Sequence, residues 1–444
     1  MYNTLIYGFH WKSQSKAIKN LAKDKIINIS FWIGAHRDAD IHIGKLRRFQ
    51  FEKKKYKGLN KEIYQKVFDE GFETFADMFS RVPTAYTLTY QEYKNIFNLY
   101  YDYFSDILIN KKIELLIYYM LPHFGSDYIL YLIAKHMGLK QILIFQSLVP
   151  NRFFYVHSLD DFGEFKNIKT TFPHSFIHIE KKPQKKLFYM KYIKPKYKSC
   201  IVNYFKNLGR WIYRKHGYMS FFAFHKLFKD CIEFKINYNK YAKKEVDFNK
   251  NYVYFPLQMQ PELTTTTLGG IYKDQLLAIE HLRTILPDDW YIYVKENPKQ
   301  LGQYRDKYFF KRLNAIKNTV YISKEVNTYD LLINSKFSAT VTGTVGWESI
   351  TMGKPTLIFG KAWYSNLPGV IKYSNDLNIE DILNTKIEHN ELEKKYNKLI
   401  QKTAVGIIDR GYIANYPEYS DEKNAKNVYN SLKVIINSLK ETNV

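Results

Sequence analysis

Short apolar runs alternate with longer amphipathic stretches in the first part of the chain. Thr4 to Tyr7, Ile26 to Trp32 and Glu114 to Tyr119 have the length and the apolar content of buried strands. The stretch from Lys45 to Asp106 has a helical pattern that is rich in Phe and Tyr. Further predicted elements are helices at Ser15 to Lys23 and Tyr128 to Met137 and a strand at Gln141 to Phe145. This alternation favours a parallel sheet with helices on both faces.

The alternation disappears between about Leu159 and Lys250 and then resumes. Strands are predicted at Tyr252 to Pro256, Trp290 to Lys295, Thr319 to Ile322, Ala339 to Thr342 and Thr356 to Phe359, and helices at Tyr272 to Leu286, Tyr329 to Asn334 and much of Glu391 to Leu439. A chain of 444 residues usually exceeds one core. We therefore predict an α/β fold with an N-terminal domain at residues 1–250, a C-terminal domain at residues 251–395, and helices at residues 396–444 that pack back on the N-terminal domain.

Ser338 to Gly360 contains a strand, a glycine turn, a helix and a second strand. Gly343 and Gly346 permit a tight turn, and a helix from near Trp347 would direct its unpaired amides at a phosphate. The residues that add hydroxyl or carboxylate groups here are Thr342, Thr344, Glu348 and Ser349. This pattern indicates a nucleotide-sugar site, although any strand–helix–strand crossover also needs glycine turns.

A net charge of +24 implies an anionic partner. Lys181 to Lys215 contains twelve Lys or Arg residues and no Asp or Glu, interleaved with aromatic residues. The side chains proposed to face a membrane or an acceptor are Lys206, Arg210, Trp211, Arg214 and Lys215. This inserted basic helical segment predicts docking on an anionic membrane surface. The alternatives are a solvated helix that packs on its own domain and nucleic-acid binding, for which the sequence contains no signature.

Cys200 and Cys231 lack metal-ligand spacing and the density of a disulfide framework, which suits a reducing compartment. No apolar run approaches the roughly 20 residues of a membrane span, and the first twelve residues lack the pattern of a signal peptide. We therefore expect a cytoplasmic protein that is peripheral on the inner membrane.

Six segments carry a family resemblance: Tyr254 to Glu262, Thr264 to Gly270, Asp274-Gln275, Tyr293 to Pro298, Thr342 to Ile350 and Gly353 to Pro355. In order and spacing they resemble the bacterial capsular polysaccharide synthesis proteins, which are relatives of the Kdo transferases. The resemblance implies a GT-B architecture, with two Rossmann-like domains that face a cleft. It further implies a nucleotide sugar on the C-terminal domain, an acceptor on the N-terminal domain, and no metal or other cofactor.

Gln260-Pro261 matches a Gln-Pro motif that helps these transferases bind CMP. Asn297-Pro298 stands where the family has His-Pro, and an asparagine amide hydrogen-bonds but carries no charge, so CMP specificity stays open. Lys295 would supply a cation for the phosphate. Gln258 and Glu262 complete the predicted donor-binding residues, because they lie close to the end of one strand of the same predicted sheet.

Candidates for an acid, base or nucleophile are His10, His123 and Asp127, all in loops that follow predicted strands. The alternative for Asp127 is helix capping, and His10 is more often structural. Asp38-Ala-Asp40 resembles a metal-binding motif of another glycosyltransferase fold, but it does not follow a nucleotide-binding unit, so no metal site is predicted.

These observations predict a glycosyltransferase that uses a nucleotide-activated sugar, with a CMP-linked ulosonic acid favoured. The acceptor would be a lipid-linked or oligosaccharide precursor of a capsule or related surface glycan, and other capsule assembly proteins are possible partners. The alternatives are a non-catalytic capsule assembly or export component with the same fold, a nucleotide-sugar epimerase, and an RNA-binding protein.

Overall fold

The computed structural model divides the chain into two compact units. It describes residues 1–47, 50–51, 60–81, 85, 87–181, 200–213, 221–260, 263–300, 302 and 304–441. Unit 1 comprises Met1–Phe79, Leu88–Ser175 and Lys398–Val444, and unit 2 comprises Ser80–Thr87 and Phe176–Asn397. Each unit contains a largely parallel sheet flanked by helices, so the chain has an α/β fold of two Rossmann-like units, as predicted.

Unit 1 has a seven-stranded sheet in the order β13-β6-β5-β4-β1-β2-β3. Its strands are β1 (Tyr2–Tyr7), β2 (Ile27–Gly34), β3 (Ile41–His42), β4 (Leu115–Tyr118), β5 (Lys140–Gln146), β6 (Arg152–Val156) and β13 (Ala404–Val405). The five strands from β1 to β5 pair in parallel, whereas β6 is antiparallel to both β5 and β13. The chain therefore starts this sheet in its middle and builds outward in both directions.

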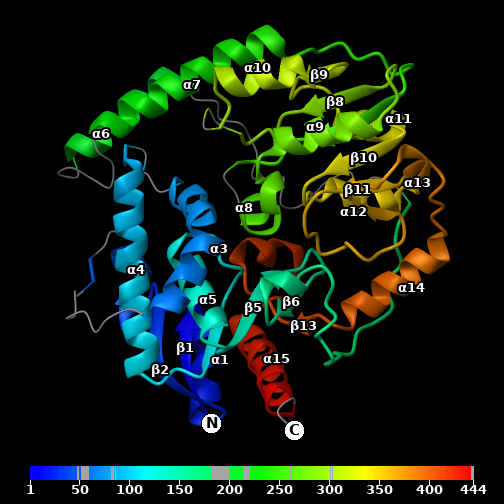
Figure 1. The fold of residues 1–444 in the computed structure, drawn as a ribbon. Coiled ribbons are helices and arrows are strands. Elements are labelled where there is room, and N and C mark those ends of the chain that lie inside the picture. The colour runs from blue at the N-terminus through cyan, green and yellow to red at the C-terminus, as the bar shows by residue number, and fades with distance from the viewer. Residues whose placement is uncertain are drawn as a thin grey trace. The chain divides into compact units, whose positions relative to one another are not determined.

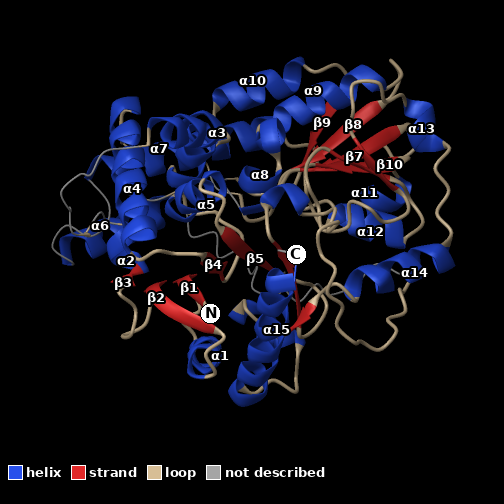
Figure 2. Cartoon of the chain, turned by 60° about the horizontal axis from the view of Figure 1, so that its bottom comes forward, coloured by secondary structure: helices blue, strands red, loops and turns tan. Residues whose placement is uncertain are grey.

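The helices of unit 1 are α1 (Lys12–Lys23), α2 (Ile43–Leu46), α3 (Lys61–Phe79), α4 (Tyr90–Asn110), α5 (Ser126–His136) and α15 (Asp421–Glu441). Helices α1 and α15 pack along one another on one face of the sheet, and α3, α4 and α5 pack together on the other (Figures 1 and 2). Helix α1 connects β1 to β2, whereas α5 connects β4 to β5 in the opposite direction along the sheet. Because such crossovers are right-handed, their helices lie on opposite faces of the sheet.

Unit 2 has six parallel strands in the order β12-β11-β10-β7-β8-β9. They are β7 (Tyr252–Pro256), β8 (Tyr291–Lys295), β9 (Thr319–Ile322), β10 (Phe337–Thr340), β11 (Thr356–Ile358) and β12 (Val370–Lys372). Its helices are α6 (Cys200–Tyr213), α7 (Phe221–Tyr241), α8 (Leu263–Leu268), α9 (Gln275–Ile285), α10 (Lys307–Ala315), α11 (Thr328–Asn334), α12 (Val345–Thr351), α13 (Ile379–Leu383) and α14 (His389–Ile400). None of the described helices is long and apolar enough to span a bilayer.

The sheet of unit 2 is buried on both faces. Val253 and Phe255 of β7 pack in a core with α9 and α10, whereas Tyr252 and Tyr254 pack in a second core with α11 and α12. Figure 2 shows α9 and α10 on one side of these strands and α11 and α12 on the other. Apolar residues at consecutive positions are therefore needed, which explains why the strands could be recognised in the sequence.

The unit boundary lies away from the predicted position near residue 250. The main part of unit 2 begins at Phe176, and α7 within it contributes Phe234 to the core formed by β7, α9 and α10. The segment from Lys398, for which we expected helices packing on the N-terminal domain, belongs to unit 1 and adds β13 to its sheet.

The two cysteines are paired in the structure. Cys200 of α6 and Cys231 of α7 form a disulfide with their Cα atoms 6.0 Å apart. Sequence reasoning had treated them as reduced residues, because two cysteines 31 positions apart carry no recognisable pattern. The expectation of a reducing compartment stays a prediction.

Candidate functional site

The strand order reverses once in each sheet, and ligands of open α/β sheets bind beyond the carboxyl ends of the strands at such a point. In unit 1 the reversal lies between β1 and β4, and in unit 2 it lies between β7 and β10. The loops after these four strands contain most of the predicted site residues.

Gln258, after β7, contacts Thr342, after β10. The Gln258 side chain donates to Thr342 Oγ1 at 2.9 Å and accepts from the Thr342 amide at 2.9 Å. The Gln275 side chain accepts from the Gln258 amide at 2.7 Å and donates to its carbonyl at 2.9 Å. β10 ends at Thr340, two residues earlier than predicted. Gln258 therefore joins the two loops of the reversal point.

The glycine turn after β10 is tightly packed. A Cβ atom on Gly346 would lie 2.3 Å from Tyr364 Oη, and one on Gly343 would lie 2.6 Å from Thr340 Oγ1. The Tyr364 hydroxyl donates to the Gly343 carbonyl, and burial raises the pKa of this tyrosine. Packing within the unit is therefore sufficient to require both glycines. Helix α12 begins at Val345 rather than near Trp347.

Glu348 lies in the first turn of α12 and is half-buried, and Thr344 is the half-buried residue before that helix. Burial, and then the Glu348 charge, raises the pKa of Tyr329 to about 12 and also raises that of Tyr364. Ser349 is fully buried, and its hydroxyl donates to two carbonyls beyond the helix, at 3.1 and 3.2 Å. Glu348 and Thr344 therefore remain the more accessible polar groups of this turn.

Lys295 ends β8 with only 5% of its surface exposed. Its Nζ donates to the Val326 carbonyl at 2.6 Å and to Thr328 Oγ1 at 2.7 Å. Burial lowers the pKa of Lys295 to about 8. Asn297, two residues later, accepts from the Lys299 amide at 2.9 Å and so stabilises the following turn.

Gln260 contacts a buried ion pair between Arg305 and Glu296 that was not predicted from the sequence. Its side chain accepts from Arg305 Nη1 at 2.8 Å and donates to the Lys273 carbonyl. Arg305 pairs with Glu296 at 2.7 Å, and both side chains are fully buried. An arginine in a loop nine residues after a strand-end glutamate gives no periodic signal, so sequence reasoning missed it. Glu262 lies outside the described residues.

In unit 1, His10 follows β1 and is half-buried. Its ring centroid lies 5.0 Å from that of Trp11 and 5.5 Å from that of Tyr119, and its Nδ1 is buried without a hydrogen-bond partner among the described residues. Burial lowers the pKa of His10, and His36, Arg47 and His42 lower it further. The imidazole is therefore neutral at pH 7.

Two further groups at this edge were missed from the sequence. His36, after β2, stacks edge-on against Trp32 at 4.3 Å, and its Nε2 is buried without a partner among the described residues. The Arg47 guanidinium lies 3.6 Å from the Phe124 ring centroid. His36 follows β2, and Arg47 follows β3 and the short helix α2. Their positions after neighbouring parallel strands were the only sequence feature that could have indicated a site.

His123 lies in the loop after β4, and Asp127 lies in the first turn of α5, which follows that loop. The Asp127 carboxylate, which is 1% exposed, accepts from the amides of His123 at 3.0 Å and Phe124 at 2.7 Å. His123 Nδ1 lies 2.9 Å from the Leu121 carbonyl and 3.9 Å from Asp127. This geometry gives Asp127 a role in shaping the turn before α5. Among the three candidates, His10 therefore has the most accessible side chain.

The predicted membrane-facing residues lie on or after α6. Ile201, Val202 and Phe205 are 55%, 48% and 62% exposed, and Lys206 is exposed on the same helix. The side chains of Arg210 and Trp211, and all of Arg214 and Lys215, lie outside the described residues. Among the described residues, no group of three or more His, Cys, Asp or Glu residues is arranged to hold a metal ion.

A family model described as "Capsule polysaccharide biosynthesis protein" matches residues 167–406, more than half of the chain. The chain belongs to this family. The match confirms the resemblance seen in the sequence and covers nearly all of unit 2. No curated protein matches the sequence.

Solved structures with similar folds include two Thermosulfurimonas dismutans KpsC structures. The β Kdo 2,7 transferase is 13% identical, with 84% of this chain and 97% of that chain covered and a TM-score of 0.33. The β Kdo 2,4 transferase is 12% identical, with 68% and 87% covered and a TM-score of 0.30. A UDP-GlcNAc 2-epimerase from Neisseria meningitidis is 11% identical, with 99% and 100% covered and a TM-score of 0.19. At these values the likeness carries no functional argument.

Proposed function

We propose that this member of the capsule biosynthesis family is a glycosyltransferase that transfers a sugar from a nucleotide-activated donor to a capsule or related surface glycan. The observation that carries the proposal is the family match over unit 2, whose glycine turn lies at the strand-order reversal of its sheet. The motif resemblance favours a CMP-linked ulosonic acid as the donor.

On the donor side, Glu348 would accept hydrogen bonds from ribose hydroxyls, and Thr344 would contribute a hydroxyl beside it. A protonated lysine has three N–H donors, and Lys295 uses two on Val326 and Thr328. The third is assigned to a donor phosphate oxygen. With a pKa of about 8, Lys295 is mostly protonated at pH 7 and supplies positive charge to the leaving phosphate.

On the acceptor side, His10 would act as the general base. A neutral imidazole accepts the proton of an attacking hydroxyl, and the lowered pKa keeps His10 in that form at pH 7. Its position after β1, at the strand-order reversal of unit 1, is where an open α/β sheet binds its ligand. No metal ion or other cofactor takes part in this proposal.

The exposed apolar side chains of α6 and the basic residues around them would hold the protein on an anionic membrane surface. This docking would bring the enzyme near a lipid-linked acceptor and near other capsule assembly proteins. It accords with a cytoplasmic protein that is peripheral on the inner membrane.

A panel of CMP, CDP, UDP, GDP and their common sugar conjugates, measured by thermal shift and calorimetry, tests the donor assignment. A ligand that binds the folded state raises apparent stability by mass action. Selective binding of CMP compounds is expected, and transfer to an acceptor is then assayed with the CMP-sugar. A preference for UDP or GDP compounds would replace the ulosonic acid by a hexose donor.

One observation favours a second candidate, a non-catalytic capsule assembly component. The side chains of Gln258, Gln260 and Ser349 are engaged in hydrogen bonds within unit 2. Folded protein that binds no nucleotide in the panel would select this candidate over the transferase.

A further inference from the structure

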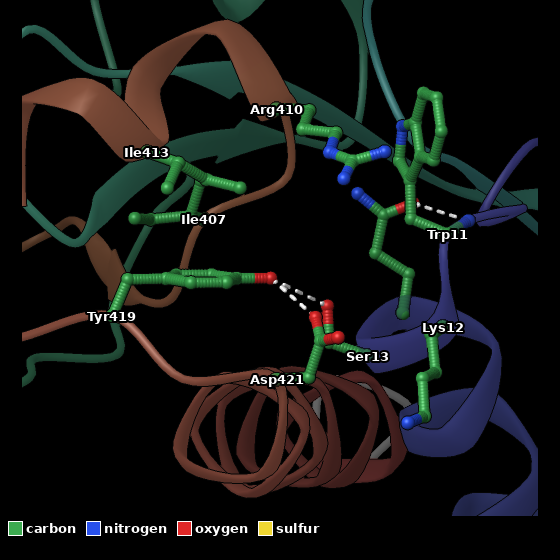
Figure 3. A pocket seen from close by; sticks show the side chains of 9 residues that line it. Trp11, Lys12, Ser13, Ile407, Arg410, Ile413, Tyr419 and Asp421 are labelled. Atoms are coloured by element: carbon green, nitrogen blue, oxygen red, sulfur yellow. Dashed lines mark hydrogen bonds between the residues drawn. The ribbon is translucent and has the colours of Figure 1, made fainter.

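Unit 1 contains a pocket of about 290 Å³, lined by both apolar and polar side chains, beside the loop that follows β1 (Figure 3). It is lined by Trp11, Lys12, Ser13, Gln14, Ile407, Arg410, Ile413, Tyr419 and Asp421. The first four residues come from the start of α1, and the others come from the segment between β13 and α15 and from the first residue of α15. Both segments belong to unit 1, although they are separated by almost the whole chain.

One side of the pocket combines an aromatic ring with positive charge. The Arg410 guanidinium lies 4.8 Å from the Trp11 ring centroid, and Figure 3 shows the two side chains next to one another. Lys12 begins α1, whose first turn contains no acidic residue to offset the positive end of the helix dipole. The field on this side therefore favours a negatively charged ligand.

The other side presents hydroxyl and carboxylate groups that are already oriented. The Tyr419 hydroxyl donates to Asp421 Oδ1 at 2.7 Å and lies 3.2 Å from Ser13 Oγ. Ser13 Oγ also accepts from the Asn424 side chain at 3.1 Å. Groups held in place by such bonds lose little freedom when a ligand binds.

We propose that this pocket binds one carboxylate-bearing sugar residue of the acceptor glycan. The proposal rests on the proposed transferase function. Trp11 provides an apolar surface for a sugar ring, Arg410 binds its carboxylate, and Asp421 and Tyr419 bind its hydroxyls. The volume lies at the lower limit of ligand pockets, roughly 300 Å³, which suits a single sugar ring better than a nucleotide sugar.

The position of the pocket links it to the proposed chemistry. The rings of His10 and Trp11 are 5.0 Å apart, so a sugar held on Trp11 lies beside the proposed general base. The pocket therefore serves as an acceptor subsite that favours acidic glycans.

Ligand-observed NMR titrations of the full-length protein test this proposal with short oligomers of glucuronic acid, galacturonic acid and sialic acid. Carboxyl-reduced forms of the same oligomers are the matched neutral ligands. At least one acidic oligomer is expected to bind, and Arg410→Gln should weaken it about tenfold or more through loss of a charge-assisted hydrogen bond. Trp11→Leu should weaken acidic and neutral forms alike. Lys426→Gln removes an exposed positive charge from α15 outside the pocket and should leave binding unchanged.

Three results would overturn the proposal: no binding of any acidic oligomer, equal binding of the carboxyl-reduced form, or unchanged binding after Arg410→Gln. The outcome of the nucleotide-binding panel does not depend on the outcome of these glycan titrations. Arg410-dependent binding of an acidic oligomer by a protein that binds no nucleotide would uphold the pocket and reject the transferase. Nucleotide binding and sugar transfer without acidic-glycan binding would reject only the pocket.

Discussion

Arg305 and Glu296 form a fully buried ion pair that also contacts neighbouring polar groups. Tyr321 donates to Glu296 Oε2 at 3.0 Å, and Gln260 accepts from Arg305 at 2.8 Å. Burying a charge costs free energy, and in this pair the opposite charge of the partner offsets that cost. Removing one partner therefore leaves the other charge buried and uncompensated. The intact pair therefore stabilises the loops at the edge of the unit 2 sheet, and loss of either partner should destabilise them.

Arg305→Met is expected to destabilise unit 2 by about 3–5 kcal/mol, because Glu296 loses its partner. The matched control is Arg312→Met, since Arg312 pairs with Asp274 and Glu280 at the surface and is 45% exposed. Such surface pairs contribute about 0–1 kcal/mol. Chemical denaturation of both variants checks the difference, and similar losses would contradict the role of burial.

Glu348→Ala should weaken binding of the nucleotide identified in the panel by about tenfold or more, because a carboxylate that accepts ribose hydroxyls is removed. Glu391→Ala, at an exposed position in the first turn of α14, removes the same charge elsewhere in the chain. Calorimetry measures both variants. Unchanged affinity in Glu348→Ala would remove this residue from the site.

Lys295 predicts a pH effect on stability with a definite sign. Burial lowers its pKa from 10.5 to about 8, so between these values the unfolded chain binds more protons than the folded one. Stability therefore rises with pH in this window. Relative to Lys295→Met, the wild type should gain up to about 3 kcal/mol between pH 7.5 and pH 10. Urea unfolding at several pH values measures the difference, and parallel curves for the two proteins would refute it.

At the scale of elements, buried strands were the most predictable features. β7 and β9 have the predicted bounds, because their residues are apolar or β-branched at nearly every position. β3, β6, β12 and β13 were not predicted. β13 has two residues and pairs with β6, some 250 positions earlier, so nothing in its local sequence marks it as a strand.

Two helical glycines are expected to respond to alanine in opposite ways. In Gly346→Ala the new methyl group overlaps the Tyr364 ring, so the variant should lose about 1–3 kcal/mol. Among the described residues, apart from the backbone of α6 itself, no heavy atom lies within 4 Å of a Cβ position at Gly209 of α6. Gly209→Ala should therefore gain about 0.4–1 kcal/mol, because alanine restricts the unfolded chain. Thermal unfolding without ligand compares them. A neutral Gly346→Ala would show that packing does not require this glycine.

At the scale of the whole molecule, the chain contributes the short segment Ser80–Thr87 to unit 2, leaves unit 1 again after Ser175 to form the main part of unit 2, and returns at Lys398. The returning segment supplies both β13 and α15, and it completes the pocket at the start of α1. The family match ends at residue 406, so it includes little of this segment.

The net charge of +24 and the exposed apolar residues of α6 predict membrane association. The protein should float with vesicles that contain anionic lipid at low salt, and less so at high salt, where surface charges are screened. Ile201→Ser with Phe205→Ser should reduce flotation. Ile109→Ser is the control, because Ile109 is 62% exposed on α4, which belongs to unit 1. Recovery of the wild type in the unbound fraction at low salt would reject membrane docking.

The sequence by itself determined the α/β class, most strands and the family resemblance, because these depend on local apolar patterns and on short motifs. Tertiary structure decided which polar residues are engaged inside the protein. Gln258 and Thr342 are 84 positions apart, and their pairing follows from the strand order. The unit boundary, the Arg305–Glu296 pair and the Trp11–Arg410 pocket likewise depend on contacts between distant segments. Local sequence carries no signal for such contacts, since only the folded chain brings these groups together.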